Sequence, residues 1–357
     1  MIYLDYQATT PLAPEAREAM LPWLAGPEAM GFANPHSPHR PGRDAAAAVE
    51  VAREQVAALL PPGGRVVFTG SATEAINLAI LGRKPGQMAV SAIEHAAVLD
   101  TAQASGAGVQ VLASDSEGII APQGLAPGTE LVAVMQVNNE IGTIQPVAAW
   151  AEAAHAAGAL FLCDAVQGAG KLAPPEGADL IALSAHKLYG PKGIGALWVR
   201  DGVELAPLIH GGGQEGIRSG TLSPALIAGF GAAAVLAGRR MVADAGHVVR
   251  LWRLARGILA AWDLNGSTEN RWPGNLNLRR EGLDVARLMS DCRDLAFSAG
   301  SACASGSGRP SHVLRAIGLA DKAAKSSVRL GFGRYTTEKE LEDACARIDA
   351  AAAAQTI

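Results

Sequence analysis

A lysine that follows an apolar segment near the middle of the chain is the first candidate for chemistry. The segment 180–183 has the pattern of a buried strand, and Ser184, His186 and Lys187 come directly after it, before a glycine-rich turn at 190–195. Desolvation lowers the pKa of an ammonium group, so a lysine in this place can act as a nucleophile that forms a Schiff base. The alternative is a lysine whose charged end reaches solvent beyond the strand.

An aspartate has a similar position after another apolar segment. Asp164 follows residues 160–163, where an unpaired carboxylate would be costly, so a cationic group is expected to face it. A protonated pyridine nitrogen of a cofactor would meet this need. An Arg or Lys partner, or exposure at the end of the sheet, would meet it equally well.

A third segment has the pattern of an anion site. Ser71 and Glu74 have the spacing of a helix capping box, and Gly70 permits close approach of the backbone. The N–H groups at this helix start, with the hydroxyls of Ser71 and Thr73, would suit a phosphate. A helix cap without a ligand is the other interpretation.

The elements that must position these residues alternate between short apolar runs and helical segments. Near-continuous apolar runs of this kind predict a mostly parallel sheet that is covered on both faces. Such sheets place their sites at the carboxyl ends of the strands. The runs are at 66–68, 88–90, 109–112, 131–135, 160–163, 180–183 and 195–199.

Six polar residues follow predicted strands of this sheet, and we expect them to share one site. They are Thr73, His95, Asn139, Asp164, His186 and Lys187.

The remaining segments predict two early helices and a second unit. Helices are expected at 15–26 and 44–60, with a Pro- and His-rich loop at 34–43 between them. A long helical stretch at 224–263 leads to a second unit with strands at 275–278, 295–298 and 327–330. We expect a large domain at 15–250 and a smaller α+β domain formed by 1–14 and 251–357.

Composition and charge favour a globular protein with no nucleic-acid partner. The 357 residues are 49% hydrophobic and 18% charged, with a net charge of -4, and no basic stripe with interleaved aromatics is present. The four cysteines form no CxxC pair, so neither a structural zinc site nor a disulfide framework is expected, and a reducing cytoplasm fits. The start of the chain lacks the pattern of a signal peptide. Residues 224–238 are apolar but too short and too glycine-broken to span a membrane, and a buried helix is expected there.

An ordered set of motifs resembles the cysteine desulfurases of the NifS/IscS type. These are pyridoxal 5'-phosphate enzymes of the class V aminotransferase family with the aspartate aminotransferase fold (PLP fold type I). The likeness covers nearly the whole chain in collinear order. It is carried by Tyr3–Pro11, Ser71–Glu74, Val137–Gly142, Asp164–Gln167, Ser184–Lys187, Arg218–Thr221, Ser298–Cys303 and Ser326–Arg329.

The resemblance implies roles around the cofactor ring for five of these residues. Lys187 would carry the cofactor as a Schiff base, and Asp164 would pair with the pyridine nitrogen. Gln167 would hydrogen-bond the ring oxygen, near which Asn139 would also lie. His95 would stack on the ring and could shuttle protons.

Other residues would hold the phosphate of the cofactor. The resemblance implies that the main contacts come from two strand ends, with one contact from a neighbouring subunit of a homodimer. The residues are Ala72, Thr73, Ser184 and His186, and Thr221 is the one from the neighbouring subunit.

The substrate and the reaction depend on two residues late in the chain. The resemblance implies that Arg329 binds the carboxylate of L-cysteine as a bidentate fork, close to Asn139. Cys303 lies in a Gly- and Ser-rich segment that is expected to be mobile. It would take the substrate sulfur as a persulfide and pass it to an acceptor protein, for iron-sulfur cluster assembly or another sulfur pathway. Taken without the resemblance, Cys303 reads as an incidental cysteine in a linker.

Two rival activities and two departures from the family pattern qualify this expectation. A selenocysteine lyase or a small aminotransferase of the same fold would need no loop thiol, and a non-catalytic scaffold would need no intact site. The segment 214–218 is one residue shorter than is usual in the family, which leaves the reach of Thr221 open. Little chain follows residue 337, where relatives use an extension to dock their scaffold protein, so the sulfur acceptor is not specified.

Overall fold

A seven-stranded, mostly parallel sheet forms the centre of the larger part of the molecule. In this computed structural model, residues 1–300 and 310–355 are described. β8 runs antiparallel to both of its neighbours, and the other pairs of adjacent strands are parallel. The predicted sheet is therefore confirmed. Its order is β2 (Gly64–Thr69), β8 (Gly195–Arg200), β7 (Leu180–Ser184), β6 (Leu160–Asp164), β5 (Leu131–Ala133), β3 (Gln87–Ser91) and β4 (Gly108–Leu112).

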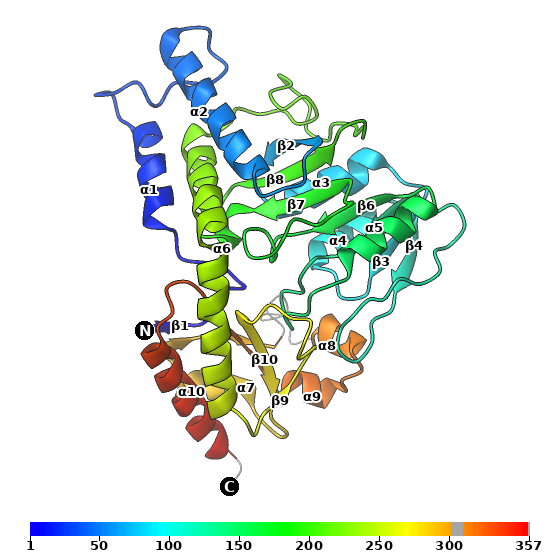
Figure 1. Ribbon diagram of the computed structural model, residues 1–357, viewed down its shortest axis with the longest axis vertical. Helices are drawn as coiled ribbons and strands as arrows, with labels where there is room; N and C mark the ends of the chain where they lie inside the picture. Colours follow the sequence, from blue (N-terminus) through cyan, green and yellow to red (C-terminus); the bar gives the residue numbers. More distant parts are fainter. Residues whose placement is uncertain (301–309, 356–357) are drawn as a thin grey trace.

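Helices cover both faces of this sheet because successive strand residues point to opposite faces. Val66 and Phe68 pack in one core with residues of α2 (Arg40–Ala57), α5 (Val147–Ala156) and α6 (Pro224–Ile258). Val67, between them in the sequence, belongs to a different core, which is built with α3 (Ala72–Arg83) and α4 (Ala96–Ala104). The alternation explains why these strands are apolar along their whole length (Figure 1).

Two helix predictions need correction at their ends. α2 begins at Arg40, inside the segment that was expected to be a loop, because the His39 side chain accepts from the Gly42 N–H and Pro41 suits the first turn. The helix expected at 15–26 is shorter. It consists of α1 (Pro14–Met20) followed by a 3-10 turn, η1 (Leu21–Leu24).

The second unit is built on a four-stranded antiparallel sheet. Its order is β12 (Ser298–Ala299), β13 (Ser327–Gly331), β10 (Asn275–Arg279) and β9 (Asp263–Leu264). The strand expected at 295–298 is divided. β11 (Leu295–Ala296) pairs in parallel with β1 (Ile2–Tyr3) at the start of the chain, whereas β12 pairs with β13.

Among the described residues, four helices complete this unit, and its core joins distant parts of the chain. They are α7 (Val285–Asp291), α8 (His312–Ala316), α9 (Asp321–Lys325) and α10 (Glu338–Ala353). Leu4 and Leu251 belong to the same core as residues of β10, β13 and α10. Val313 and Leu314 of α8 instead pack into the core of the large sheet. The domain boundary near residue 250 therefore stays a prediction.

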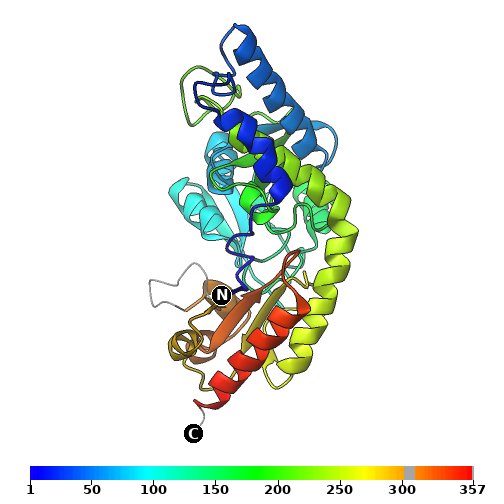
Figure 2. The same ribbon diagram turned by 90° about the vertical axis from the view of Figure 1, so that its left-hand side faces the viewer.

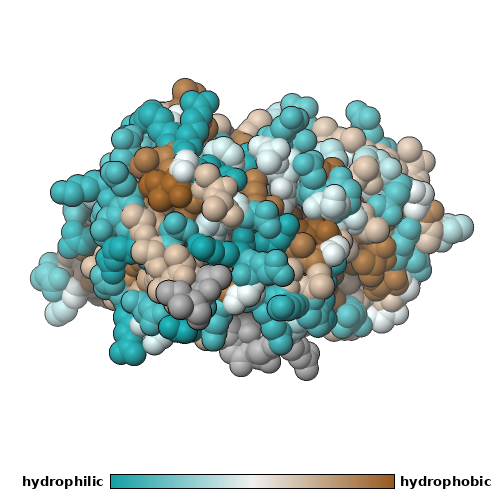
Figure 3. Space-filling model, turned by 90° about the horizontal axis from the view of Figure 1, so that it is seen from below, coloured by the Kyte–Doolittle hydropathy of each residue, from teal (hydrophilic) through white to brown (hydrophobic). Residues whose placement is uncertain are grey.

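α6 runs along the length of the molecule and connects the two units (Figure 1). Its length and composition alone would allow it to cross a membrane. Ile227 and Phe230, however, are fully buried in the core of the large sheet, and α10 lies beside the C-terminal half of the helix (Figure 2). α6 is thus a core helix. Seen from below, the surface that the second unit forms is mainly hydrophilic, with small apolar patches (Figure 3).

Candidate active site

A cavity of about 330 Å³ lies at the carboxyl ends of the large sheet's parallel strands, next to β13 of the second unit. It brings together ten of the twelve predicted site residues. Thr221 does not line this cavity, and Cys303 lies outside the described residues. The ten are Ala72, Thr73, His95, Asn139, Asp164, Gln167, Ser184, His186, Lys187 and Arg329.

Lys187 enters the cavity from a short 3-10 turn, η2 (Ala185–Lys187), which directly follows β7. Its amine donates to the backbone carbonyls of Gln7 and Ala8, the latter at 2.9 Å. Tyr189, two residues later, adopts a left-handed conformation with φ of 68°, which is uncommon for a non-glycine residue. The Tyr189 N–H donates to Thr10 Oγ1 at 2.8 Å, so the N-terminal segment stabilises the turn that presents Lys187.

Asp164 is the last residue of β6 and is buried. Its Oδ1 accepts from the Val166 N–H at 2.9 Å. Burial raises the pKa of this carboxyl, while the hydrogen bond, His95 and Lys187 act in the opposite direction. A cation in the cavity would therefore stabilise the ionised form of Asp164.

His95 begins α4 and also lines the cavity. Its Nδ1 accepts from the Ala97 N–H at 3.0 Å, as in a helix cap. This contact fixes the orientation of the ring at the edge of the cavity and leaves Nε2 as the atom that can carry a proton.

The start of α3 also lines the cavity. Ser71 Oγ accepts from the Glu74 N–H at 3.1 Å, as predicted. Glu74 Oε2 accepts from the Gly70 N–H at 2.7 Å, one residue before the N–H that a capping box uses. The helix start faces the cavity through Ala72 and Thr73. This is the arrangement that binds phosphate at helix N-termini.

His186 adds a neutral donor or acceptor to the site. Burial, followed by the nearby Lys187 and Lys192, lowers the pKa of His186 to about 4. Its Nδ1 lies 3.1 Å from Thr9 Oγ1. The imidazole is therefore uncharged at neutral pH, and it can hydrogen-bond an anion through a ring N–H.

The residues of the cavity fit pyridoxal phosphate. Asp164 can face a protonated ring nitrogen, the start of α3 can hold a phosphate, and Lys187 can bond an aldehyde carbon. A further observation comes from Gln167, whose Oε1 is buried without a hydrogen-bond partner among the described residues. Its Nε2 donates to the Gln7 carbonyl at 3.0 Å. A buried amide oxygen without a partner is costly, and a polar group bound in the cavity can satisfy it.

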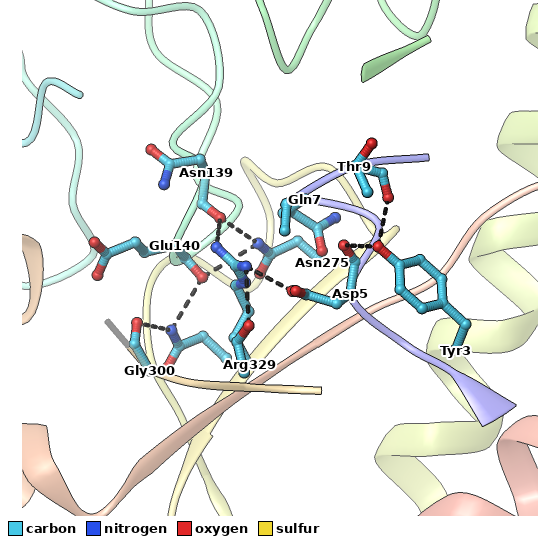
Figure 4. Close-up of polar contacts among 12 residues, drawn as sticks. Tyr3, Asp5, Gln7, Thr9, Asn139, Glu140, Asn275, Gly300 and Arg329 are labelled. Atoms are coloured by element: carbon cyan, nitrogen blue, oxygen red, sulfur yellow. Dashed lines mark hydrogen bonds and ion pairs between the residues drawn. The ribbon is translucent and has the colours of Figure 1, made fainter. Parts of the chain in front are cut away.

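Arg329 reaches the cavity from β13, and its side chain is 1% exposed. Its Nη2 contacts Asp5 Oδ1 at 2.7 Å, and its Nη1 donates to the Asn139 carbonyl at 3.1 Å (Figure 4). A guanidinium fixed in this way can bind a carboxylate that enters the cavity.

Comparison with known proteins agrees with this geometry. The aminotransferase class-V profile matches residues 2–343. The chain is 43% identical to cysteine desulfurase IscS of Rickettsia akari (strain Hartford) over 98% of its own length and 91% of the relative's. It is 45% identical to cysteine desulfurase IscS of Psychromonas ingrahamii (strain DSM 17664 / CCUG 51855 / 37), over 96% of its length and 90% of the relative's. The chain belongs to the class-V aminotransferases, among the cysteine desulfurases.

Solved structures of this family have the same fold. One NifS-like protein is 30% identical with a TM-score of 0.89, and 98% of each chain is covered. A structure described as SspA in complex with cysteine is 36% identical with a TM-score of 0.82, covering 94% of this chain and all of that one. The family depends on pyridoxal phosphate, and so does this desulfurase.

Three residues that the sequence analysis did not select lie in or next to the desulfurase site. Asp5 contacts Arg329, and the Gln7 carbonyl accepts from both Lys187 and Gln167. Both lie in a motif that carried the resemblance, although no role was inferred for them. Glu94, next to His95 in the sequence, is buried, and burial raises the pKa of its carboxyl to about 8.

Thr221 lies apart from the cavity in the desulfurase. It lines a separate hollow of about 100 Å³ with Gly70 and Gly193. Contact between Thr221 and the phosphate of a neighbouring subunit stays a prediction.

The segment 214–218, which we expected to be one residue shorter than is usual in the family, contacts α2, the large sheet and α3. The Glu215 carboxylate pairs with Arg53 at 2.7 Å and accepts from the Phe68 N–H at 2.9 Å. Arg218 Nε donates to Glu74 at 2.8 Å. The segment therefore reaches α3, the helix whose start lines the cavity.

Proposed function

We propose that this desulfurase removes the sulfur atom of L-cysteine, releases L-alanine and leaves the sulfur as a persulfide on Cys303. One observation carries the proposal. A single cavity combines Lys187, Asp164 and the start of α3 with the buried Arg329 of the second unit. The first three suit the cofactor, and the guanidinium suits the carboxylate of an amino acid.

Each residue would have a defined task in this cavity. Pyridoxal phosphate, when bound, supplies an electron sink for the charge that develops on the substrate Cα. Asp164 would keep the ring nitrogen protonated, and Arg329 would orient the substrate through its carboxylate. The Lys187 amine would remove the Cα proton, and His95 would hold or return a proton at its Nε2.

The sulfur transfer would take place between two sulfur atoms. The Cys303 thiolate attacks the substrate sulfur and forms the S–S bond, while the C–S bond breaks and its electron pair stays with the substrate carbon. A proton then adds to that carbon. The sum is L-cysteine plus the Cys303 thiol giving L-alanine plus the Cys303 persulfide, so no external oxidant or reductant is needed.

Substitution of the thiol tests this reaction. We expect Cys303→Ser to bind the cofactor normally but to form neither persulfide nor alanine from L-cysteine at a measurable rate. Alanine would be measured by chromatography and the persulfide by mass spectrometry of the intact protein. Cys292→Ala, which changes a buried cysteine of the second core, is the control. Alanine formation at the normal rate in Cys303→Ser would reject the proposal in favour of a selenocysteine lyase or a small aminotransferase.

The proposed partners are a sulfur acceptor protein and a second copy of the chain, and both follow from the family resemblance. The terminal sulfur of the persulfide would pass to an acceptor protein for iron-sulfur cluster assembly or another sulfur pathway. The enzyme would act as a cytoplasmic homodimer, with Thr221 of each subunit serving the other. Trapping a mixed disulfide between Cys303 and its acceptor would identify the pathway.

A further inference from the structure

Glu140 contacts one border of the segment that carries Cys303 directly and is linked to the other through Asn277. The described chain stops at Gly300 and resumes at residue 310. Ser311 hydrogen-bonds to Glu140, which lies 171 positions before it. Gly300 and Glu140 share a hydrogen-bond donor, the side chain of Asn277. Glu140 itself is 2% exposed.

At the C-terminal border the contact is made by side chains. Ser311 Oγ donates to Glu140 Oε2 at 2.5 Å. Ser311 Oγ also accepts from the Leu314 N–H at 3.0 Å and so caps the start of α8. The next residue, His312, contacts the Glu94 carbonyl through its Nε2 at 2.9 Å. The start of α8 is therefore fastened to the loops that follow β3 and β5.

At the N-terminal border the contact is made through an amide. Asn277 Nδ2 donates to the Glu140 carbonyl at 3.0 Å and reaches the Gly300 carbonyl at 3.4 Å. The Gly300 N–H donates to the Ser327 carbonyl at 2.7 Å. This border is thus held by β13 and linked through Asn277 to the backbone of Glu140, whereas the other border contacts the Glu140 carboxylate itself.

The residue before Glu140 belongs to the active site. The Asn139 carbonyl accepts from Arg329 Nη1 at 3.1 Å and from Asn275 Nδ2 at 3.2 Å. Burial raises the pKa of the Glu140 carboxyl, and the Ser311 hydrogen bond, His312 and Arg329 oppose this shift. Glu140 thus lies between the group that would bind the substrate carboxylate and the ends of the segment that carries the thiol.

We propose that Glu140 is a positioning residue for sulfur transfer. Its carboxylate holds Ser311, and its carbonyl holds Asn277. Together these contacts fix where the Cys303 segment begins and ends relative to the substrate. Glu140 would not touch substrate or cofactor. The proposal rests on the function proposed for Cys303, and it concerns the delivery of the thiol rather than the chemistry at Cα.

Separate assays of the two half-reactions test the proposal. Exchange of the Cα hydrogen of L-alanine in deuterium oxide, followed by NMR, reports on Lys187 and the cofactor without the thiol. Persulfide formation from L-cysteine in a single turnover reports on delivery of the thiol. We expect Glu140→Ala to slow persulfide formation about 10- to 100-fold, because small errors of position are costly in such steps. Exchange should stay within about twofold of wild type, because the backbone contacts of Asn139 and Glu140 are kept.

Three further variants separate positioning from stability. Glu140→Gln keeps an oxygen that can accept from Ser311, so it should recover most of the rate. Ser311→Ala should reproduce the defect of Glu140→Ala, and the double variant should be no slower than either, as expected for residues that act through one contact. Glu117→Ala is the matched control. It removes another Glu–Ser contact, from Glu117 Oε2 to Ser267 Oγ at 3.3 Å, and should leave both assays unchanged.

The outcomes that overturn the proposal are distinct from failure of the proposed function. Equal losses of exchange and persulfide formation in Glu140→Ala would show that Glu140 acts on the whole site. Normal persulfide formation in both Glu140→Ala and Ser311→Ala would show that the contact has no role in delivery. Normal alanine formation by Cys303→Ser would instead reject the function on which the proposal rests.

Discussion

The two ends of the active site are constructed in different ways. At the cofactor end, Asp164 and Lys187 follow neighbouring strands, so the local order of the chain places them at one edge of the sheet. At the substrate end, Arg329 is held by Asp5, which lies 324 positions earlier in the sequence. The first end follows from strand order, whereas the second exists only after distant segments have packed. We therefore expect substitutions at the first end to abolish chemistry and those at the second to change binding.

Removal of Lys187 should have the largest effect on the rate of the reaction. A small effect would contradict the contrast drawn between the cofactor end and the substrate end. We expect Lys187→Ala to lower the rate of alanine formation by about 10³-fold or more, since a general base contributes about 10²–10⁴-fold. After borohydride reduction, mass spectrometry should find no cofactor attached to the variant. Covalently attached cofactor in Lys187→Ala would disprove the role of this lysine. Lys192→Ala, in the following turn, is the control.

Loss of the guanidinium should affect binding more than turnover. Lysine keeps the charge of Arg329 but not its planar pair of donors. We expect Arg329→Lys to raise KM for L-cysteine about 10- to 100-fold, the worth of about one charged hydrogen bond. The change in kcat should be smaller. A fall in kcat with an unaltered KM would assign Arg329 to the chemistry and would remove the contrast between the two ends.

Neutralisation of Asp5 should have a smaller effect, in the opposite direction. The Asp5 carboxylate pairs with Arg329, so it would share the guanidinium with the substrate carboxylate and would repel that carboxylate. Asn keeps an oxygen that can accept from Arg329 and removes the repulsion, so KM for L-cysteine should fall by about threefold. Steady-state kinetics and calorimetric binding of L-alanine would measure this. A rise in KM would show that Asp5 serves mainly to orient Arg329.

The last expected effect is on stability rather than on activity, and it concerns the cofactor end. The pKa of Glu94 is raised to about 8 by burial, compared with about 4.3 for an unperturbed glutamate. Between these values the folded protein holds a proton that the unfolded chain has lost, so Glu94 makes stability fall as pH rises through this range.

Glu94→Gln removes the carboxyl that takes up this proton when the protein folds. Relative to wild type, the variant should therefore gain stability from about pH 5 to about pH 8 and show no further relative gain above it. Urea unfolding at several pH values would measure the difference. A constant difference across this range would show that Glu94 is ionised in the folded protein.

The strand-end residues show how much of the site could be predicted. A lysine or an aspartate directly after an apolar run is visible in the sequence, and parallel strands bring their carboxyl ends to one edge. The start of α2 could not be predicted in the same way, because its cap is the side chain of a histidine, which is an unusual capping residue. The division of 295–298 into two strands could also not be predicted from the sequence. It depends on pairing of β11 with the first residues of the chain.

The sequence by itself determined the cofactor end of this protein. Apolar runs, a helix cap and the polar residues after each strand act over a few positions, so their consequences are local. Only the tertiary structure decided the other contacts of the site. These contacts join segments far apart in the chain. They are the ion pair of Asp5 with Arg329, the carbonyl of Gln7 at Lys187, and the links from Glu140 to Ser311 and, through Asn277, to Gly300. Spacing cannot specify such partners, because buried polar groups find them only when the cores of the two units have formed.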